Sequence, residues 1–491
     1  MKSPLESLTH LEIYEASLST GRGGRLFLGR RGREKFLGCM GSACLAHADK
    51  AGELDGQDVF VGPCDHDNAV VIRDQLRWTA PKLLGLRTSI GLGDRLGLAT
   101  PGHIRAARGK GLGVVLAQQS IREMTRTRRT PENVMDAATY GVLQEGFTDG
   151  FGSDADHLQK TEDIDATVPA GFTMFTIDPG AHVINEADAL SDDEALAATE
   201  QFNYASLETD LTTLWERYVG KTFPLDGGGE VVFRSADYAR ALVKYGRAVA
   251  HTVTMYRYLC DSASEPFELE VSVDETESPT TPAEHYFFAN ELSRLGVKWV
   301  SMAPRFVGRF EKGVDYLGDL DAFRASFAEH VAVMRTLGPY KISIHSGSDK
   351  FSVYPIVSEL TDGLVHVKTA GTSYLEAIRA IARIDPGLFR EIYDFARAHY
   401  EDDKKTYHVS ADMAKVPAAA EWTDEQLAER IDDFDTRQAL HVTFGSVLTL
   451  DDGERFRRRI YAALAADEEA HYAALAAHLG RHAEPFARPA K

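Results

Sequence analysis

The sequence predicts an α/β protein built on a (β/α)₈ TIM-type barrel, and three observations lead to that fold. From about residue 85 onward, short apolar runs alternate with helix-like segments, which is the pattern of parallel βαβ units. There are eight such runs, and each ends in polar or small residues. The runs occupy residues 86–95, 113–120, 146–157, 172–182, 267–275, 297–305, 341–350 and 364–371. Barrels of this class carry their active sites at the carboxyl ends of the strands, so the polar endings predict an enzyme site there.

A doubly wound sheet is the alternative fold for alternating strands and helices. Such folds usually place a GxGxxG loop after the first strand to hold a dinucleotide. The glycine-rich stretches at 21–29 and 108–115 do not fit that fingerprint. The barrel is therefore the better interpretation.

Three segments lie outside the repeating pattern. Residues 1–84 mix short β-like runs with glycines and are predicted to form an N-terminal accessory region. The catalytic barrel is predicted to span 85–450, with a helical insertion at about 183–265. Residues 451–491 are predicted to form a C-terminal helical extension, with one terminal helix over 453–482. The insertion and the extension would decorate the barrel and could close over its mouth.

Composition and charge exclude several classes of function. With 44% hydrophobic and 26% charged residues, the 491-residue chain resembles ordinary globular proteins. The net charge of −20 repels nucleic-acid phosphates and anionic lipids, so neither is an expected partner. No run approaches the roughly 18 apolar residues of a membrane span, and the N-terminus lacks an apolar signal core. We therefore expect a cytoplasmic protein that binds a small molecule, and a homo-oligomer is compatible with the sequence.

Histidines at the strand ends are the first candidates for the site. Alternate residues of a strand face opposite sides, so His345 is predicted to point into the barrel. By the same parity His366 and Lys368 of the last run point inward. His157, directly after Asp156, is a third candidate. Histidine and carboxylate ligands from several strand ends suit a divalent metal with an open position for a substrate.

Carboxylates close the run at 267–275. Strand parity places Glu270 and Asp274 inward, whereas Glu275 reaches the site if the strand ends early. Simpler interpretations stand beside these. A lone histidine at a strand end is more often a hydrogen-bonded core residue than a ligand. Asp156 could simply cap the helix that follows it.

Six motifs give the sequence a resemblance to the tagaturonate epimerase family, in order from about residue 85 to about residue 450. They are GLGDRLGLATPGH, DADHLQKTEDID, FTIDP, VDETESPTTPAEHYF, ISIHSGSDKFSVYP and HVKTAGTSYLEA. The last two are the specific ones. The resemblance implies an isomerase of hexuronate catabolism that interconverts D-tagaturonate and D-fructuronate. It also implies dependence on a divalent metal cation, with Zn, Mn, Fe, Ni and Co as candidates.

The same resemblance implies roles for individual residues. The metal ligands would be His157, His345 and His366. The acid/base pair would be Asp156 and Glu275, with Glu270 or Asp274 as alternatives to Glu275. The substrate's carboxylate and hydroxyls need cationic and polar partners, and a structural ion pair is the competing interpretation for each cation. The candidates are Arg95, Ser346, Ser348, Lys350 and Lys368.

The chemistry of the two ketouronates limits the mechanism. They differ at one hydroxyl-bearing carbon that is β to the ketone, so its C–H is not acidic and direct removal of that proton would be very slow. Transient oxidation would need a nicotinamide, for which the sequence shows no fingerprint. Retro-aldol cleavage, rotation of the aldehyde and re-addition is the predicted route, with one residue removing the hydroxyl proton and another returning it.

Other function classes fit parts of the sequence. A metal-dependent aldolase or ketol isomerase acting on another acidic sugar would use the same ligands. A non-catalytic sugar-binding protein should have lost some candidate residues, and this chain retains them all. A helical interaction module at 183–265 could coexist with catalysis.

Overall fold

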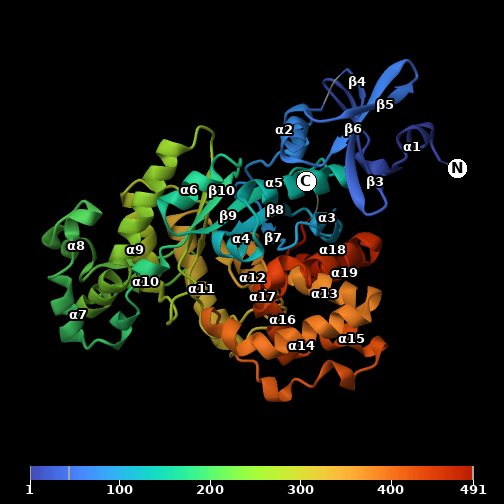
Figure 1. Cartoon of the computed structure of the whole chain (residues 1–491). Coiled ribbons are helices and arrows are strands. Elements are labelled where there is room, and N and C mark those ends of the chain that lie inside the picture. The colour runs from blue at the N-terminus through green and yellow to red at the C-terminus, as the bar shows by residue number, and fades with distance from the viewer. Residues whose placement is uncertain (1, 43–44, 489–491) are drawn as a thin grey trace.

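The N-terminal region is a small antiparallel sheet at one side of the molecule (Figure 1). The computed structural model describes residues 2–42 and 45–488. The strands pair in the order β1-β3-β4-β6-β5, with β2 beside β3. Their bounds are β1 Glu12–Ile13, β2 Ser19–Gly21, β3 Gly24–Arg31, β4 Glu34–Gly41, β5 Asp49–Leu54 and β6 Gln57–Pro63, flanked by α1 Pro4–Thr9 and α2 His66–Gln75. The β-like runs predicted within residues 1–84 are present, and the boundary at residue 84 stays a prediction.

Both faces of this sheet are apolar, because side chains alternate along each strand. Leu26 and Leu28 of β3 share one buried cluster with Ile72 of α2 and with Leu143, which belongs to the barrel. Phe27 lies in a separate cluster on the other face. The contact with Leu143 packs the N-terminal sheet onto the barrel.

A closed barrel of parallel strands forms the centre of the described chain (Figure 1). Its order is β10-β13-β14-β15-β16-β7-β8-β9, closing back onto β10. The bounds are β7 Ser89–Leu92, β8 Gly113–Ser120, β9 Gly152–Leu158, β10 Met174–Ile177, β13 Glu268–Ser272, β14 Ser301–Ala303, β15 Lys341–Ile344 and β16 Val365–Thr369. Each of the eight predicted runs contains one of these strands, so the predicted (β/α)₈ barrel is confirmed.

Helices follow the barrel strands and cover them. They are α3 Thr100–Ala107, α4 Ile121–Thr127, α5 Pro131–Gln144, α6 Thr161–Thr167, α9 Ser235–Ser262, α10 Pro282–Arg294, α11 Leu320–Leu337, α12 Tyr354–Thr361 and α13 Thr372–Ile384. Local sequence sets several of their starts. At α10, for example, the Thr281 hydroxyl accepts from the Glu284 amide, and the Glu284 carboxylate accepts from the Thr281 amide. Strand and helix side chains between the two layers form one large apolar core.

The segment between β10 and β13 is largely helical, as predicted for residues 183–265, and extends to the left in Figure 1. It contains α7 Asp192–Thr199, α8 Leu211–Tyr218 and the 28-residue α9. The sequence did not predict its two-stranded ribbon, β11 Thr222–Pro224 with β12 Glu230–Val232. Three consecutive glycines, Gly227 to Gly229, turn this ribbon with φ values of 93°, 106° and 87°.

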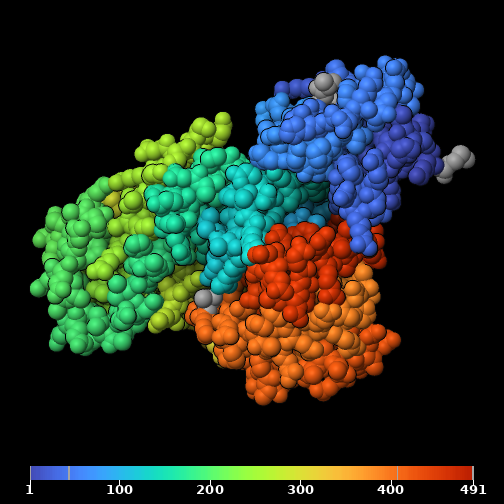
Figure 2. Space-filling model, in the orientation of Figure 1, coloured from blue at the N-terminus to red at the C-terminus, as the bar shows by residue number. Residues whose placement is uncertain are grey.

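Helices after α13 lie below and to the right of the barrel in Figures 1 and 2. They are α14 Pro386–Asp403, α15 Asp424–Arg430, α16 Phe434–Val442, α17 Phe444–Thr449, α18 Arg457–Ala466 and α19 Glu468–Ala483. A second apolar cluster joins α13 to α14–α18, and it contains Leu96 as well as residues between Tyr374 and Leu464. It crosses residue 450, where the extension was predicted to begin, and that boundary stays a prediction.

The terminal helix predicted over 453–482 is divided into α18 and α19 in the described chain. The break is Asp467, whose backbone leaves the helical region at φ −142° and ψ 76°. Its side chain accepts a hydrogen bond from the Ala470 amide and so caps α19.

Short 3₁₀ turns complete the secondary structure. They lie at Glu15–Ser17, Arg77–Thr79, Gly180–His182, Asn185–Ala189, Tyr204–Leu207, Lys404–Thr406, Met413–Lys415, Ala419–Glu421, Leu450–Gly453 and Glu484–Phe486. Among the described residues, none of the helices combines the length and the apolar character needed to cross a membrane.

Candidate active site

A pocket lies at the carboxyl ends of the barrel strands, bordered by the C-terminal helices. Eight of the ten side chains predicted for the site line it: Arg95, Asp156, His157, Glu275, His345, Ser346, Ser348 and Lys368. The other two, His366 and Lys350, are buried next to it. The structure thus gathers into one pocket most of the residues that the sequence proposed, although their roles stay predictions.

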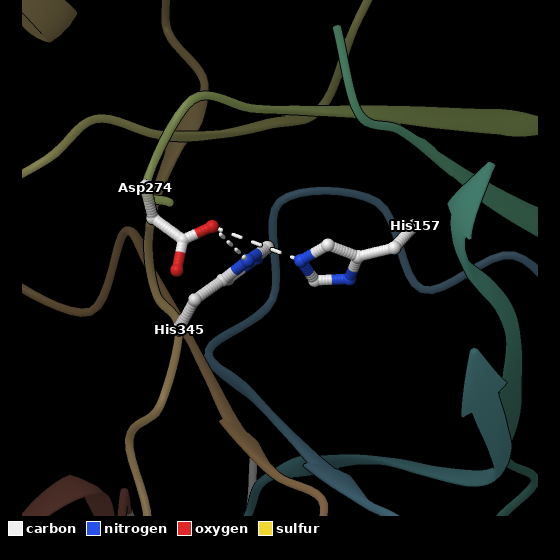
Figure 3. Close-up of side chains that lie close together, drawn as sticks. All are labelled: His157, Asp274 and His345. Carbon is white, nitrogen blue, oxygen red and sulfur yellow. Dashed lines mark hydrogen bonds and ion pairs between the residues drawn. The ribbon is translucent and has the colours of Figure 1, made fainter. Parts of the chain in front are cut away.

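His157, Asp274 and His345 point toward one another at the mouth of the barrel (Figure 3). Asp274 Oδ1 lies 3.1 Å from His345 Nδ1 and 3.7 Å from His157 Nε2. One ligand atom of each residue lies within 4.8 Å of the other two, so the group could hold a metal ion. Two imidazoles and one carboxylate match the donor sets of catalytic zinc and of related divalent metals.

An irregularity in β9 explains how two consecutive residues, Asp156 and His157, both reach the pocket. In a regular strand they would face opposite sides. Between β9 and β10 the pairing shifts by one residue, from Ala155↔Phe175 to Leu158↔Ile177, so the β9 side carries an extra residue here. His157 takes a left-handed φ of 55°, which non-glycine residues adopt at a cost. This bulge turns both side chains toward the mouth.

The alternation predicted for β13 is observed. Glu270 and Asp274 both contact His345, with Glu270 Oε1 2.6 Å from His345 Nε2. Val271 and Val273 lie between them in the chain and pack into the apolar core. Asp274 is the member of the three-residue group that the sequence had proposed only as an alternative acid or base.

Lys368 is surrounded by carboxylates. Its Nζ lies 2.7 Å from Asp154, 2.6 Å from Asp156 and 2.6 Å from Glu270. Burial alone would lower the pKa of Lys368, but the three carboxylates outweigh burial and raise it well above its usual range. Burial would raise the pKa of Asp156, but the charges of His157 and Lys368 bring it below its ordinary value. The positive charge of Lys368 is therefore already neutralised by carboxylates of the protein.

His366 lies deeper in the barrel than the group at the mouth. Its Nδ1 is 2.9 Å from Ser89 Oγ, and its Nε2 meets no hydrogen-bond partner among the residues described. Burial lowers the pKa of His366 to about 3, so the ring is neutral and able to bind a cation. It is not a member of the His157–Asp274–His345 group, and its role as a ligand stays a prediction.

Arg95 lines the pocket with its guanidinium already engaged. Nε donates to Glu123 Oε1 at 2.9 Å, and Nη1 donates to the carbonyl of His441 at 3.2 Å. The guanidinium carbon also lies 3.6 Å from the centre of the Phe444 ring. These contacts join the loop after β7 to α16 and α17, so Arg95 has a structural role in holding these segments together.

Lys350 is also engaged. Its buried Nζ donates to the carbonyls of Glu311 at 2.7 Å, Val314 at 2.5 Å and Ser348 at 2.9 Å. Burial lowers the pKa of Lys350 to about 7. The amine thus fastens the loop after β14 to the loop after β15. In the same loop, Ser346 takes a left-handed φ of 48° and faces the pocket.

Glu275 is the most accessible carboxylate of this region, with 30% of its side chain exposed. Oε1 lies 3.4 Å from Arg122 Nη2 and 3.8 Å from Lys312 Nζ, which are long distances for ion pairs. Burial would raise the pKa of Glu275, but Lys312 and other nearby cations hold it below its ordinary value. Arg122 and Lys312 both line the pocket, and the sequence interpretation had missed both.

Gln118 and His441 are further pocket residues that the sequence interpretation did not find. Gln118 could have been proposed, because it lies among the polar residues that close the second run. His441 comes from α16, far along the chain, and reaches the pocket through two glycines: a Cβ on Gly371 would lie 2.0 Å from its Cε1, and one on Gly313 3.0 Å from its Nδ1. Neither the Gln118 amide nor His441 Nδ1 meets a hydrogen-bond partner within the described ranges, so both have polar atoms available for a ligand.

A second group of two histidines and an aspartate, Asp349, His478 and His482, joins the loop after β15 to α19. Here Arg437 Nη2 lies 3.0 Å from Asp349 Oδ2 and 3.2 Å from His478 Nε2. The Asp349 amide donates to His482 Nε2 at 2.8 Å. A guanidinium and an amide hydrogen thus already occupy the atoms that a metal would need.

A (β/α)₈ barrel with a metal-type donor group and further carboxylates at its mouth defines an enzyme of the kind that acts on small polar substrates. Within that class, a sequence model of the tagaturonate epimerase family matches residues 14–486. The chain belongs to this family.

Known relatives agree with this assignment over nearly the whole chain. The chain is 42% identical to the tagaturonate/fructuronate epimerase of Thermotoga maritima over 475 residues, 96% of each chain. It is also similar to crystal structures of the fructuronate-tagaturonate epimerase of Cohnella laeviribosi. The glycerol complex has a TM-score of 0.92 at 36% identity, covering 98% of each chain. The native structure has a TM-score of 0.92 at 37% identity, covering 98% of this chain and 97% of that one.

Proposed function

We propose that this chain is a tagaturonate/fructuronate epimerase, an isomerase that acts on hexuronates. One observation carries the proposal: two members of the His157–Asp274–His345 group, the histidines, line a pocket at the barrel mouth together with the carboxylates Asp156 and Glu275. Membership of the tagaturonate epimerase family, and the names of the Thermotoga and Cohnella relatives, support the substrate pair.

A divalent cation is part of the proposal, and the geometry of the donor group supports it. Asp156 Oδ1 lies 2.7 Å from His157 Nδ1, which directs His157 Nε2 toward Asp274. A carboxylate behind an imidazole is the usual arrangement that orients a metal-ligating histidine. His157, Asp274 and His345 would hold the cation, with the unpaired Nε2 of His366 as a further predicted ligand atom. When bound, such a cation supplies Lewis-acid polarisation of the ketone oxygen.

The proposed reaction is reversible carbon–carbon cleavage. A base takes the proton of the hydroxyl on C4, the C3–C4 bond breaks, and its electron pair passes to the ketone fragment as an enediolate. C4 becomes the aldehyde of tartronate semialdehyde. Rotation about C4–C5 presents the other aldehyde face, the C3–C4 bond forms again, and an acid returns the proton to the new C4 oxygen. Atoms and electrons balance without an external oxidant.

Asp156 and Glu275 are the proposed acid/base pair. Both line the pocket, so both have the access to the substrate that proton transfer requires. Of the three carboxylates that close β13, Glu270 is buried against Lys368 and His345, and Asp274 lies between two histidines. Glu275 is the one with substantial exposure toward the pocket, which supports it as the second acid/base group.

The deciding experiment measures epimerase activity and bound metal together. Purified protein is assayed with tagaturonate, treated with a chelator, assayed again, and then reloaded with single divalent cations. We expect activity to disappear on chelation and return with at least one cation. Activity that survives complete metal removal would refute the metal assignment, whatever the substrate.

The assay also separates the alternative functions. A metal-loaded protein that does not epimerise tagaturonate, but cleaves or isomerises another acidic sugar, would favour the aldolase or ketol isomerase interpretation. Detection of free tartronate semialdehyde during turnover would support the retro-aldol route. Tightly bound nicotinamide without any such leakage would refute it. The cytoplasmic location and the oligomeric state stay predictions.

A further inference from the structure

The hexuronate substrate carries a carboxylate at C6, two bonds from the reacting C4. A recognition site for it needs a cation that can make a direct, charge-assisted hydrogen bond. Three cations were predicted from the sequence for this task. In the structure Arg95 is bound to Glu123, Lys350 to backbone carbonyls, and Lys368 to carboxylates. Each already has its partners within the protein.

Two other cations face the same pocket with weaker engagement. Arg122 is the second residue of α4, which directly follows β8, and its side chain is 40% exposed. Lys312 lies in the loop after β14, with 23% of its side chain exposed. Both pair with Glu275, whose Oε1 lies 3.4 Å from Arg122 Nη2 and 3.8 Å from Lys312 Nζ. These distances exceed the roughly 2.7–2.9 Å of a charge-assisted hydrogen bond, so both cations have donor capacity left for a ligand.

Neighbouring residues hold the two cations in place. Lys312 Nζ donates to Ser346 Oγ at 2.7 Å. The Arg122 guanidinium carbon lies 5.6 Å from the centre of the Tyr407 ring, and Tyr407 OH in turn accepts from Arg126. A guanidinium and an ammonium that converge from two different loops form a preorganised anion site at the pocket wall.

We propose that Arg122 and Lys312 bind the C6 carboxylate of the hexuronate and hold the C4–C6 fragment while its aldehyde rotates. The assignment rests on the proposed epimerase function. Both cations contact Glu275, the proposed acid/base residue for the C4 hydroxyl, so a carboxylate bound there lies near the reacting carbon. Retro-aldol cleavage leaves the carboxylate on the aldehyde fragment. A fixed carboxylate then keeps that fragment in the pocket and allows rotation about C4–C5.

The test uses the two halves of the substrate as separate probes. Glycerate resembles the C4–C6 fragment, and dihydroxyacetone resembles the C1–C3 fragment. Inhibition of the full-length enzyme by each is measured in the wild type, Arg122→Met and Lys312→Met, together with KM for tagaturonate. We expect each variant to raise KM and the glycerate inhibition constant by about 30-fold, because a hydrogen bond to a charged group is lost. Inhibition by dihydroxyacetone should change by less than about twofold, because its hydroxyls and ketone do not need these cations.

Matched variants keep the outcome interpretable. Arg128→Met removes an arginine at the end of the same helix, whose partner is the exposed Asp452, and should leave every constant unchanged. Arg122→Lys keeps the charge without the guanidinium fork and should show an intermediate loss if Arg122→Met does not fold. A wild type without epimerase activity would overturn the proposed function itself. An active wild type whose glycerate inhibition is absent, or equal in all variants, would overturn the carboxylate assignment alone.

Discussion

The chain contains two groups made of two histidines and one aspartate, and their surroundings differ. At the barrel mouth, Lys368 forms ion pairs with Asp154 and Asp156. Asp274 is instead grouped with His157 and His345. At the C-terminal helices, the guanidinium of Arg437 binds the aspartate of the group directly. The same side chains therefore make a potential cation site in one place and a structural tether in the other. The comparison teaches that the neighbouring cation, more than the ligand composition, decides what such a group can do.

The largest expected contrast is in activity. His345→Gln should lower kcat by about a thousandfold, because loss of the donor group removes several kcal/mol of transition-state stabilisation. His482→Gln, in the second group, should keep kcat within about threefold, since His482 does not line the pocket. Steady-state kinetics of both variants, with circular dichroism to confirm folding, measure the contrast. Equal losses in the two variants would break the comparison.

Stability should show the reverse contrast. Asp349→Ala leaves the buried Arg437 without its closest carboxylate and should lower the free energy of unfolding by about 3 kcal/mol. Asp274→Ala should cost much less, because its partners His157 and His345 can lose their charge, whereas the Arg437 guanidinium cannot. Urea denaturation of the two variants gives both values. A larger loss for Asp274→Ala would contradict the structural role assigned to Asp349.

Metal affinity sharpens the comparison further. Asp156→Asn weakens the acceptor behind His157 and should lower divalent-cation affinity by about 10- to 100-fold. Competition with a coloured chelator measures this affinity. The control is His478→Gln, which alters a histidine of the second group and should leave the affinity unchanged. If His478→Gln also weakened the affinity, the tether would have to be reconsidered as a cation site.

The smallest expected effect is on the pH dependence of stability. Burial lowers the pKa of His482 to about 4, below the ordinary value of about 6.5. The unfolded chain therefore binds this proton more readily than the folded one. The stability that depends on neutral His482 is complete above about pH 6.5, and the free energy of unfolding decreases as the pH drops toward 4. His482→Gln should remove up to about 1.4 kcal/mol per pH unit of that slope. Denaturation series between pH 4.5 and 7, chosen to span roughly this window, test it; an unchanged slope would mean that His482 does not titrate there.

Much of the fold could be predicted because it depends on local pattern. Each barrel strand is a short apolar run with polar endings, and parity along β13 and β15 was enough to place Glu270, Asp274 and His345 inside. The break at Asp467 was missed because the helical periodicity continues through it. The glycine-turned ribbon in the insertion was missed because each of its strands has three residues.

The candidate site was predicted less completely, because its electrostatics depend on contacts distant in the chain. Parity placed Lys368 inside the barrel, but its ion pairs with Asp154 and Asp156 form only because the barrel closes. The engagement of Arg95 could not be inferred, since its partner His441 lies 346 residues away. His157 reaches Asp274 and His345 through a bulge in β9 that no local sequence motif predicts.

The contact between α19 and the loop after β15 has a consequence for biosynthesis. A ribosome completes all eight barrel strands before it makes α16, which supplies His441, and α19, which supplies His478 and His482. The nascent barrel thus emerges with an unfinished pocket, and α19, which is translated after all eight strands, fastens the loop carrying Ser346 and Ser348. A chain terminated before α16 would keep the barrel strands and lose His441 from the wall of the pocket.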